Sequence, residues 1–199
     1  VSEDDTVVIP GDISWGMGRD TAAEDLTFIH NLPGRKIIGK GNHDYWWQTM
    51  AKLNRFKEEL GADSIDFLFN NAYLCEDFII AGTRGWTLEA NYSEEDLKIV
   101  NREAGRLRMS LEAAKKLGET TPGAETVVFL HYPPSFGGIV CRQLVDVMHE
   151  YGVKRCFYGH IHSVNPAILD RFADDIPIYC ISADLIGFKP MKLNKFQAV

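Results

Sequence analysis

The chain has 199 residues, of which 45% are hydrophobic and 25% are charged, as is usual for a folded protein with an ample core. Its formal net charge of −7 argues against sequence-independent binding to DNA or RNA, which depends on Lys and Arg contacts with phosphates. No apolar run approaches the roughly 18 residues that a membrane span needs. We therefore expect neither a nucleic-acid partner nor a membrane segment, and the oligomeric state is left open.

No linker or low-complexity tract divides the sequence, so we expect one domain over residues 1–199. The four cysteines form no CxxC pair, and each lies among apolar neighbours. Free, buried thiols are typical of a reducing compartment, which favours a cytoplasmic protein.

Short runs rich in β-branched residues recur along the chain and predict buried strands. Helical patterns lie between them, and one opens at Ser93, an N-cap residue followed by an acidic turn. Alternation of strands with helices predicts a layered α/β fold, to which the consecutive strands within 65–83, with a turn at Glu76-Asp77, add an antiparallel part. The expected strands lie at 6–9, 36–38, 78–81, 126–130, 156–158 and 178–181, and the expected helices at 20–32, 45–60, 93–117 and 141–151.

Four of these strands end in polar residues. In open α/β sheets, ligands bind beyond the carboxyl ends of the strands, so we expect these four clusters to converge. The clusters are Gly11-Asp12, Gly41-Asn42-His43-Asp44, His131-Tyr132-Pro133-Pro134 and Gly159-His160-Ile161-His162.

The residue types in these clusters indicate a metal site. Carboxylate, amide oxygen and neutral imidazole suit a divalent ion such as Mn, Fe, Zn or Ni. Taken singly, Gly11-Asp12 is a common turn, and His131 is compatible with a buried structural histidine. His160 and His162 carry more information, because residues i and i+2 of an extended segment share a face. Recurrence of such groups after four strands favours the metal site.

The four motifs GDISW, GNHD, HYPP and GHIH resemble those of the calcineurin-like metallophosphoesterase superfamily, over about residues 7–185. IAGTRGW (80–86) and ISAD (181–184) resemble a bacterial subgroup of phosphohydrolases. The resemblance implies a sandwich of two mixed β-sheets flanked by helices, two divalent metal ions and a phosphate-ester substrate.

The resemblance also implies roles for individual residues. Asp12 would bridge the two metals, and His162 would bind the first. His43 would stabilise the transferring phosphoryl group and act as general acid. Hydrolysis of a phosphomono- or phosphodiester would proceed by attack of a hydroxide held between the metals. The further ligands of the second metal would be Asn42, His131 and His160.

Two departures from the family pattern qualify these roles. No Asp in the chain is followed two residues later by His, so the family's opening Asp-x-His motif and its strand are expected to be missing. The chain would then be truncated at its N-terminus, and the first metal site would be incomplete. In addition, many relatives have an Asp three residues after the bridging one, where it orients the catalytic histidine. Trp15 occupies that position here, so Asp44 is the alternative catalytic partner for His43.

Other residues near the motifs have two interpretations each. Arg84 is a candidate phosphate-binding residue, with surface pairing as the alternative. The aromatic residues Trp15, Tyr45, Trp46 and Trp47 either form a stacking site for a base or aromatic leaving group, or pack in the core. A non-catalytic, protein-binding scaffold is the alternative to an enzyme. Scaffolds usually lose the later ligands and the catalytic histidine, which persist here.

Overall fold

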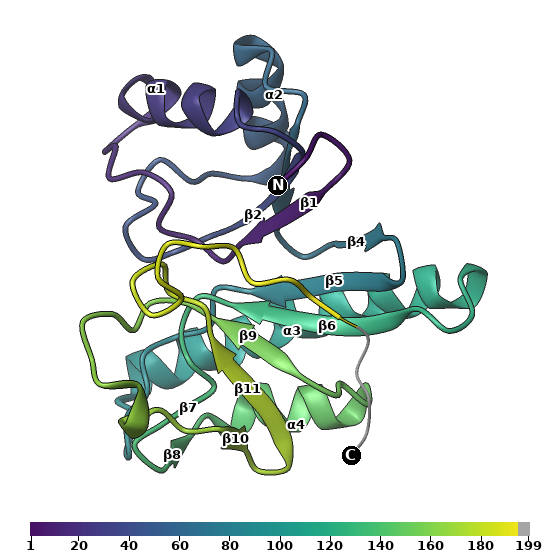
Figure 1. Cartoon of the computed structure of the whole chain (residues 1–199). Helices are drawn as coiled ribbons and strands as arrows, with labels where there is room; N and C mark the ends of the chain where they lie inside the picture. The colour runs from purple at the N-terminus through teal and green to yellow at the C-terminus, as the bar shows by residue number, and fades with distance from the viewer. Residues whose placement is uncertain (195–199) are drawn as a thin grey trace.

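The computed structural model describes residues 1–194 and consists of two stacked β-sheets with a layer of helices on each outer side (Figure 1). The expected α/β class, with sheets flanked by helices, is confirmed. The predicted domain, 1–199, extends at its end to residues 195–199, which lie outside the described residues.

The smaller sheet has three strands in the order β1-β2-β3, and all of them run parallel. In the central strand, Ile37 and Ile38 are fully buried, one on each face, as expected for a strand covered on both sides. The strands are β1 (Thr6–Ile9), β2 (Arg35–Gly39) and β3 (Ile65–Leu68).

The larger sheet is mixed and has the order β10-β11-β9-β6-β5-β4. Its four inner strands run parallel, whereas β4 and β10 pair antiparallel at the two edges. The turn between β4 and β5 contains Glu76 with a φ of 51°, which confirms the predicted turn. The strands are β4 (Ala72–Cys75), β5 (Phe78–Thr83), β6 (Glu125–Leu130), β9 (Cys156–Tyr158), β10 (Phe172–Ala173) and β11 (Ile176–Cys180), with a separate hairpin of β7 (Ser135–Phe136) and β8 (Ile139–Val140).

Apolar side chains join the layers into three clusters. One cluster fills the space between the sheets, where Ile37 of β2 packs with Ile80 and Val127 of the larger sheet. A second joins α1 and α2 to the smaller sheet, and a third joins α3 and α4 to the larger sheet. The helices are α1 (Arg19–His30), α2 (Met50–Leu60), α3 (Glu94–Thr120) and α4 (Arg142–Glu150), with a short 3-10 turn η1 (Pro166–Ile168).

The helix predictions are confirmed with one substantial correction. Ser93 caps α3, since its hydroxyl accepts from the Asp96 backbone N–H at 3.1 Å. The helix expected over 45–60 begins only at Met50. Trp46 and Trp47 are buried against the helices and the small sheet, and the Trp46 indole donates to Asp44. These contacts hold the segment before Met50 in a turn. Within the described part of the chain, no helix is both long and apolar enough to cross a lipid bilayer.

A buried lysine joins the end of α1 to the start of β2. Lys36 is 2% exposed, and its Nζ donates to the carbonyls of His30 (3.0 Å), Leu32 (2.6 Å) and Gly34 (2.6 Å). The last carbonyls of a helix have no partner within the helix, so the ammonium supplies the missing donors and a favourable charge.

Replacing this ammonium should therefore destabilise the fold. We expect Lys36→Met to lower the free energy of unfolding by about 2–4 kcal/mol, because three carbonyls around a buried position lose the ammonium donor, and among the described residues only that of His30 keeps another, the Ser64 hydroxyl. Urea denaturation measures the change. The control is Lys52→Met at an exposed position of α2, with an expected change within about 0.5 kcal/mol. Equal stability of the two variants would contradict the role of Lys36.

Candidate metal centre

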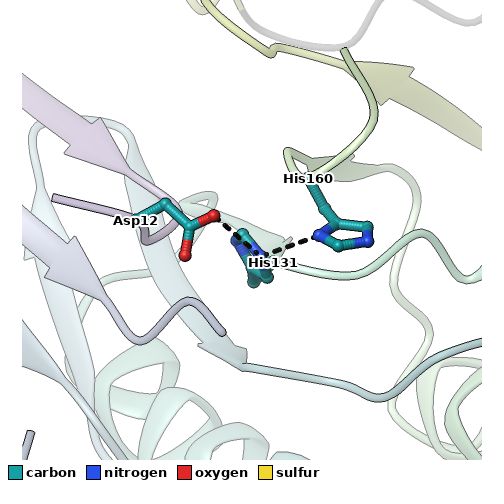
Figure 2. Close-up of side chains that lie close together, drawn as sticks. All are labelled: Asp12, His131 and His160. Atoms are coloured by element: carbon teal, nitrogen blue, oxygen red, sulfur yellow. Dashed lines mark hydrogen bonds and ion pairs between the residues drawn. The ribbon is translucent and has the colours of Figure 1, made fainter. Parts of the chain in front are cut away.

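Polar groups from four loops meet where strands of both sheets end, and Figure 2 shows three of them, Asp12, His131 and His160. Asp12 follows β1 and Asn42 follows β2, both in the smaller sheet. His131 and His160 follow β6 and β9 of the larger sheet. The structure thus brings together side chains that are far apart in the sequence, at the sheet edge where we expected them.

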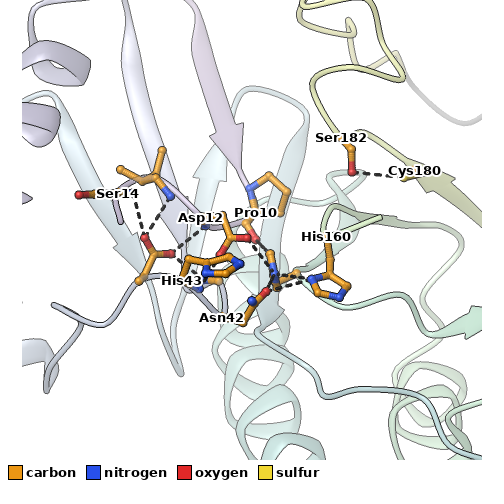
Figure 3. Close-up of polar contacts among 12 residues, drawn as sticks. Pro10, Asp12, Ser14, Asn42, His43, His160, Cys180 and Ser182 are labelled. Atoms are coloured by element: carbon orange, nitrogen blue, oxygen red, sulfur yellow. Dashed lines mark hydrogen bonds and ion pairs between the residues drawn. The ribbon is translucent and has the colours of Figure 1, made fainter. Parts of the chain in front are cut away.

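Their ligand atoms face one point. One ligand atom each of Asp12, His131 and His160 lies within 4.8 Å of the others. His131 Nε2 is 3.5 Å from Asp12 Oδ2 and 3.2 Å from His160 Nδ1. Asn42 Oδ1 lies 2.6 Å from His131 Nε2 and 2.9 Å from His160 Nδ1. Figure 3 shows Asn42 beside His160, with Asp12 and His43 nearby. This set of one carboxylate, one amide and two imidazoles fits a divalent transition metal.

The Pro10 carbonyl fixes the orientation of the His131 ring. His131 Nδ1 donates to Pro10 O at 3.1 Å, so the lone pair of the neutral ring is at Nε2, which faces the other ligands. Burial lowers the pKa of His131 to about 4, despite the opposing effect of Asp12. The imidazole is therefore neutral near pH 7, which is the form that binds a metal. Sequence reasoning did not identify the role of Pro10.

Two of the four candidate ligand residues have strained backbones. Asp12 has a φ of 56° and His160 a φ of 65°, in the left-handed region that residues with a side chain rarely adopt. Such strain is typical of functional sites, where the surrounding structure enforces a particular side-chain direction.

Two glycines allow the loops after β1 and β2 to touch. A Cβ on Gly11 would lie 2.3 Å from the Gly41 nitrogen, and a Cβ on Gly41 would lie 2.0 Å from Asp12 Oδ1. Any larger residue at either position would separate the loops. The glycines are therefore required for Asp12 and Asn42 to approach each other.

Asp44 holds these two loops in place. It is 1% exposed, and its carboxylate accepts the backbone N–H groups of Asp12 (2.8 Å), Ile13 (3.0 Å), Ser14 (3.2 Å) and Gly41 (2.7 Å). Burial raises the pKa of Asp44, and these N–H groups oppose that rise by stabilising the carboxylate. The Trp46 indole adds a fifth donor at 3.1 Å.

His43 is held by its backbone and by aromatic contacts. Its backbone N–H donates to Asp12 Oδ1 at 2.9 Å. Its ring stacks on Trp15, with ring centroids 3.8 Å apart and planes 12° apart, and meets the edge of Tyr45 at 6.1 Å. No contact described in residues 1–194 joins the Asp44 carboxylate to this ring, and His43 Nδ1 is buried without a hydrogen-bond partner there. Asp44 as the catalytic partner of His43 stays a prediction that these contacts do not support.

The other predicted site residues lie at the margin of this cluster. His162 is exposed and is not a member of the compact group formed by Asp12, His131 and His160. Burial lowers the pKa of His160, and the nearby His162 adds to this lowering. Its role as a ligand stays a prediction.

Arg84 follows β5 and is partly buried beside the cluster. Its backbone carbonyl accepts the N–H groups of His131 (3.1 Å) and Tyr132 (2.9 Å). Its guanidinium lies 4.6 Å from the centre of the Trp86 ring. Burial lowers the pKa of Arg84, and its Nε has no hydrogen-bond partner among the described residues. Phosphate binding by Arg84 stays a prediction, as does its alternative, surface pairing.

The aromatic residues divide between the two interpretations that the sequence left open. Trp46 and Trp47 belong to the core between the helices and the smaller sheet. Trp15 and Tyr45 are 70% and 54% exposed and contact His43. The sequence did not predict the contact of Trp15 with His43. The position of Trp15 could have indicated it, because many relatives have at this position the Asp that orients the catalytic histidine.

The anchoring role of Asp44 can be tested with Asp44→Asn. The amide keeps the side-chain shape but places an NH₂ group against backbone donors, so we expect the free energy of unfolding to fall by about 2–4 kcal/mol. Because the loop that bears Asp12 loosens, Mn²⁺ affinity should fall about 10- to 100-fold. Urea denaturation and calorimetric titration with Mn²⁺ measure the two effects. The exposed Asp63→Asn is the control, and Asp44→Asn with unchanged stability and affinity would contradict the role.

Comparison with known proteins agrees with this geometry. The family model for calcineurin-like phosphoesterases matches residues 1–164, which include Asp12, Asn42, His131 and His160. Comparison with curated proteins gives no significant match. The chain belongs to the calcineurin-like phosphoesterase family.

Proposed function

We propose that the chain hydrolyses phosphomono- or phosphodiesters with the help of divalent metal ions bound at the candidate metal centre. The observation that carries this proposal is the convergence of Asp12, Asn42, His131 and His160 on one point, in a chain of this family. These four residues would hold one ion. Asp12 would be shared with a second ion that His162 also binds, and this second site would have fewer protein ligands.

The metal and the protein would divide the chemistry between them. A divalent cation bound here supplies water with a pKa lowered towards about 7 and neutralises phosphate oxygens. The neutral ring of His131, held by Pro10, keeps its Nε2 available as a ligand. The bond from the His43 backbone to Asp12 places the His43 imidazole next to the metal ligands.

From that position, His43 would donate a proton to the leaving oxygen, a contribution of typically 10²–10⁴-fold to the rate. Arg84 would hold phosphate oxygens in a bidentate pair, since its buried Nε has no partner among the described residues. Both roles need a substrate phosphate at the cluster, and neither requires a covalent intermediate with the protein.

The division between metal ligands and proton donor leads to a direct test. We expect Asn42→Ala and His131→Ala to weaken Mn²⁺ binding at least about tenfold, because each removes a ligand. His43→Ala should bind Mn²⁺ normally but turn over an aryl phosphodiester or phosphomonoester about 10²–10⁴-fold more slowly. His149→Ala, at a histidine outside the cluster, serves as the control.

Metal analysis together with turnover in added Mn²⁺ separates the possible results. Equal loss of metal in all three variants, or full activity of His43→Ala, would contradict the assigned roles. Normal Mn²⁺ binding with no turnover of either ester would instead favour the non-catalytic scaffold.

The role of Arg84 predicts a change in substrate binding. Arg84→Lys keeps the positive charge but loses the planar fork that pairs with two phosphate oxygens, so KM should rise about tenfold. Mn²⁺ binding should stay unchanged, since Arg84 is not a ligand. Steady-state kinetics of Arg84→Lys and of the exposed control Arg102→Lys measure the difference, and equal KM values would refute the role.

A further inference from the structure

We propose that Trp15 is the positioning residue of the catalytic imidazole and that it holds the His43 ring by stacking. The inference rests on the proposed function, in which His43 donates a proton to the leaving oxygen. It adds a residue whose side chain carries no acid, base or metal ligand.

The geometry of the two rings is that of a face-to-face contact. The ring centroids of Trp15 and His43 are 3.8 Å apart, and the planes differ by only 12°. Tyr45 meets the same imidazole nearly at right angles, with an interplanar angle of 85°. Such contacts are attractive and restrict the χ angles of the ring, so the imidazole keeps one orientation.

Polar groups near His43 do not provide this restraint. Its Nδ1 is buried without a hydrogen-bond partner in the part of the chain that the structure describes. The nearby Asp44 carboxylate already accepts four backbone N–H groups and one indole. Asp12 bonds to the backbone N–H of His43. The aromatic contacts are therefore the interactions on which the ring orientation depends.

Hydrogen bonds hold the backbone on both sides of the exposed Trp15. On one side, the Ser14 backbone N–H donates to Asp44, and the Ser14 hydroxyl donates to Asp25 at 2.5 Å. On the other side, the Gly16 N–H donates to the Ser14 hydroxyl at 3.0 Å. The indole is 70% exposed and so contributes little to the core, whereas its stack on His43 gives it a contact inside the candidate centre.

The stack can be tested without metal by proton NMR. Protons above the face of an indole resonate upfield, so the ring C–H signals of His43 should be displaced from those of the other histidines. Loss of these signals in His43→Asn assigns them. Trp15→Ala and Trp15→Leu should return them to ordinary positions, and Trp15→Phe should retain part of the displacement. The control is Phe28→Ala, at an exposed aromatic residue of α1.

Kinetics with two aryl phosphodiesters test the catalytic consequence. A leaving phenol of high pKa needs protonation, whereas p-nitrophenol needs little. A misplaced acid can cost up to about 10²-fold. We expect Trp15→Ala to lower kcat about 10- to 10²-fold for the phenol ester and clearly less for the nitrophenol ester, with KM and Mn²⁺ binding nearly unchanged. Trp15→Phe should recover most of the loss.

Each outcome has a defined meaning. An undisplaced His43 signal, an equal loss of kcat for both esters, or full activity of Trp15→Ala would overturn the positioning role. Full activity of His43→Ala on both esters would overturn the proposed proton donor itself, and with it the catalytic meaning of the stack. The NMR displacement would still appear in that case, so the two failures are distinguishable.

Discussion

The candidate centre depends on one buried carboxylate. Asp44 accepts backbone N–H groups from the loops after β1 and β2, and so fixes two segments that carry Asp12, Asn42 and His43. The backbone N–H groups around Asp44 replace the water molecules that would otherwise solvate its carboxylate. Burial of the carboxylate is tolerated because these donors are present. The same bonds allow the unfavourable left-handed backbone of Asp12 to persist.

The positions of the strands and of the polar clusters after them could be predicted from the sequence. Runs such as Thr6–Ile9 are too apolar for a surface segment, and the polar residues that follow them mark the end of each strand. Within each sheet, the convergence of these ends follows from parallel pairing, which crossover connections through helices allow. Packing of the two sheets on each other then brings the two pairs of ends together. Asp12, Asn42, His131 and His160 were identifiable for this reason.

Features set by tertiary packing could not be predicted in the same way. The helix expected over 45–60 begins only at Met50, because the Trp46 indole donates a hydrogen bond to Asp44. Hydrophobic periodicity cannot predict such a contact between two side chains. The hydrogen-bond partner of His131 is the backbone carbonyl of Pro10, and a backbone group cannot be recognised from the type of residue that carries it. The stack of Trp15 on His43 likewise depends on the close approach of Gly11 and Gly41.

The candidate ligands of the centre follow strands of both sheets, two from each. An ion bound among them would therefore act as a cross-link between the two layers, beside the apolar cluster that already joins them. A ligand that binds only the folded state stabilises it in proportion to the logarithm of its free concentration. The supply of metal would therefore help to set the resistance of the fold to heat and to proteases.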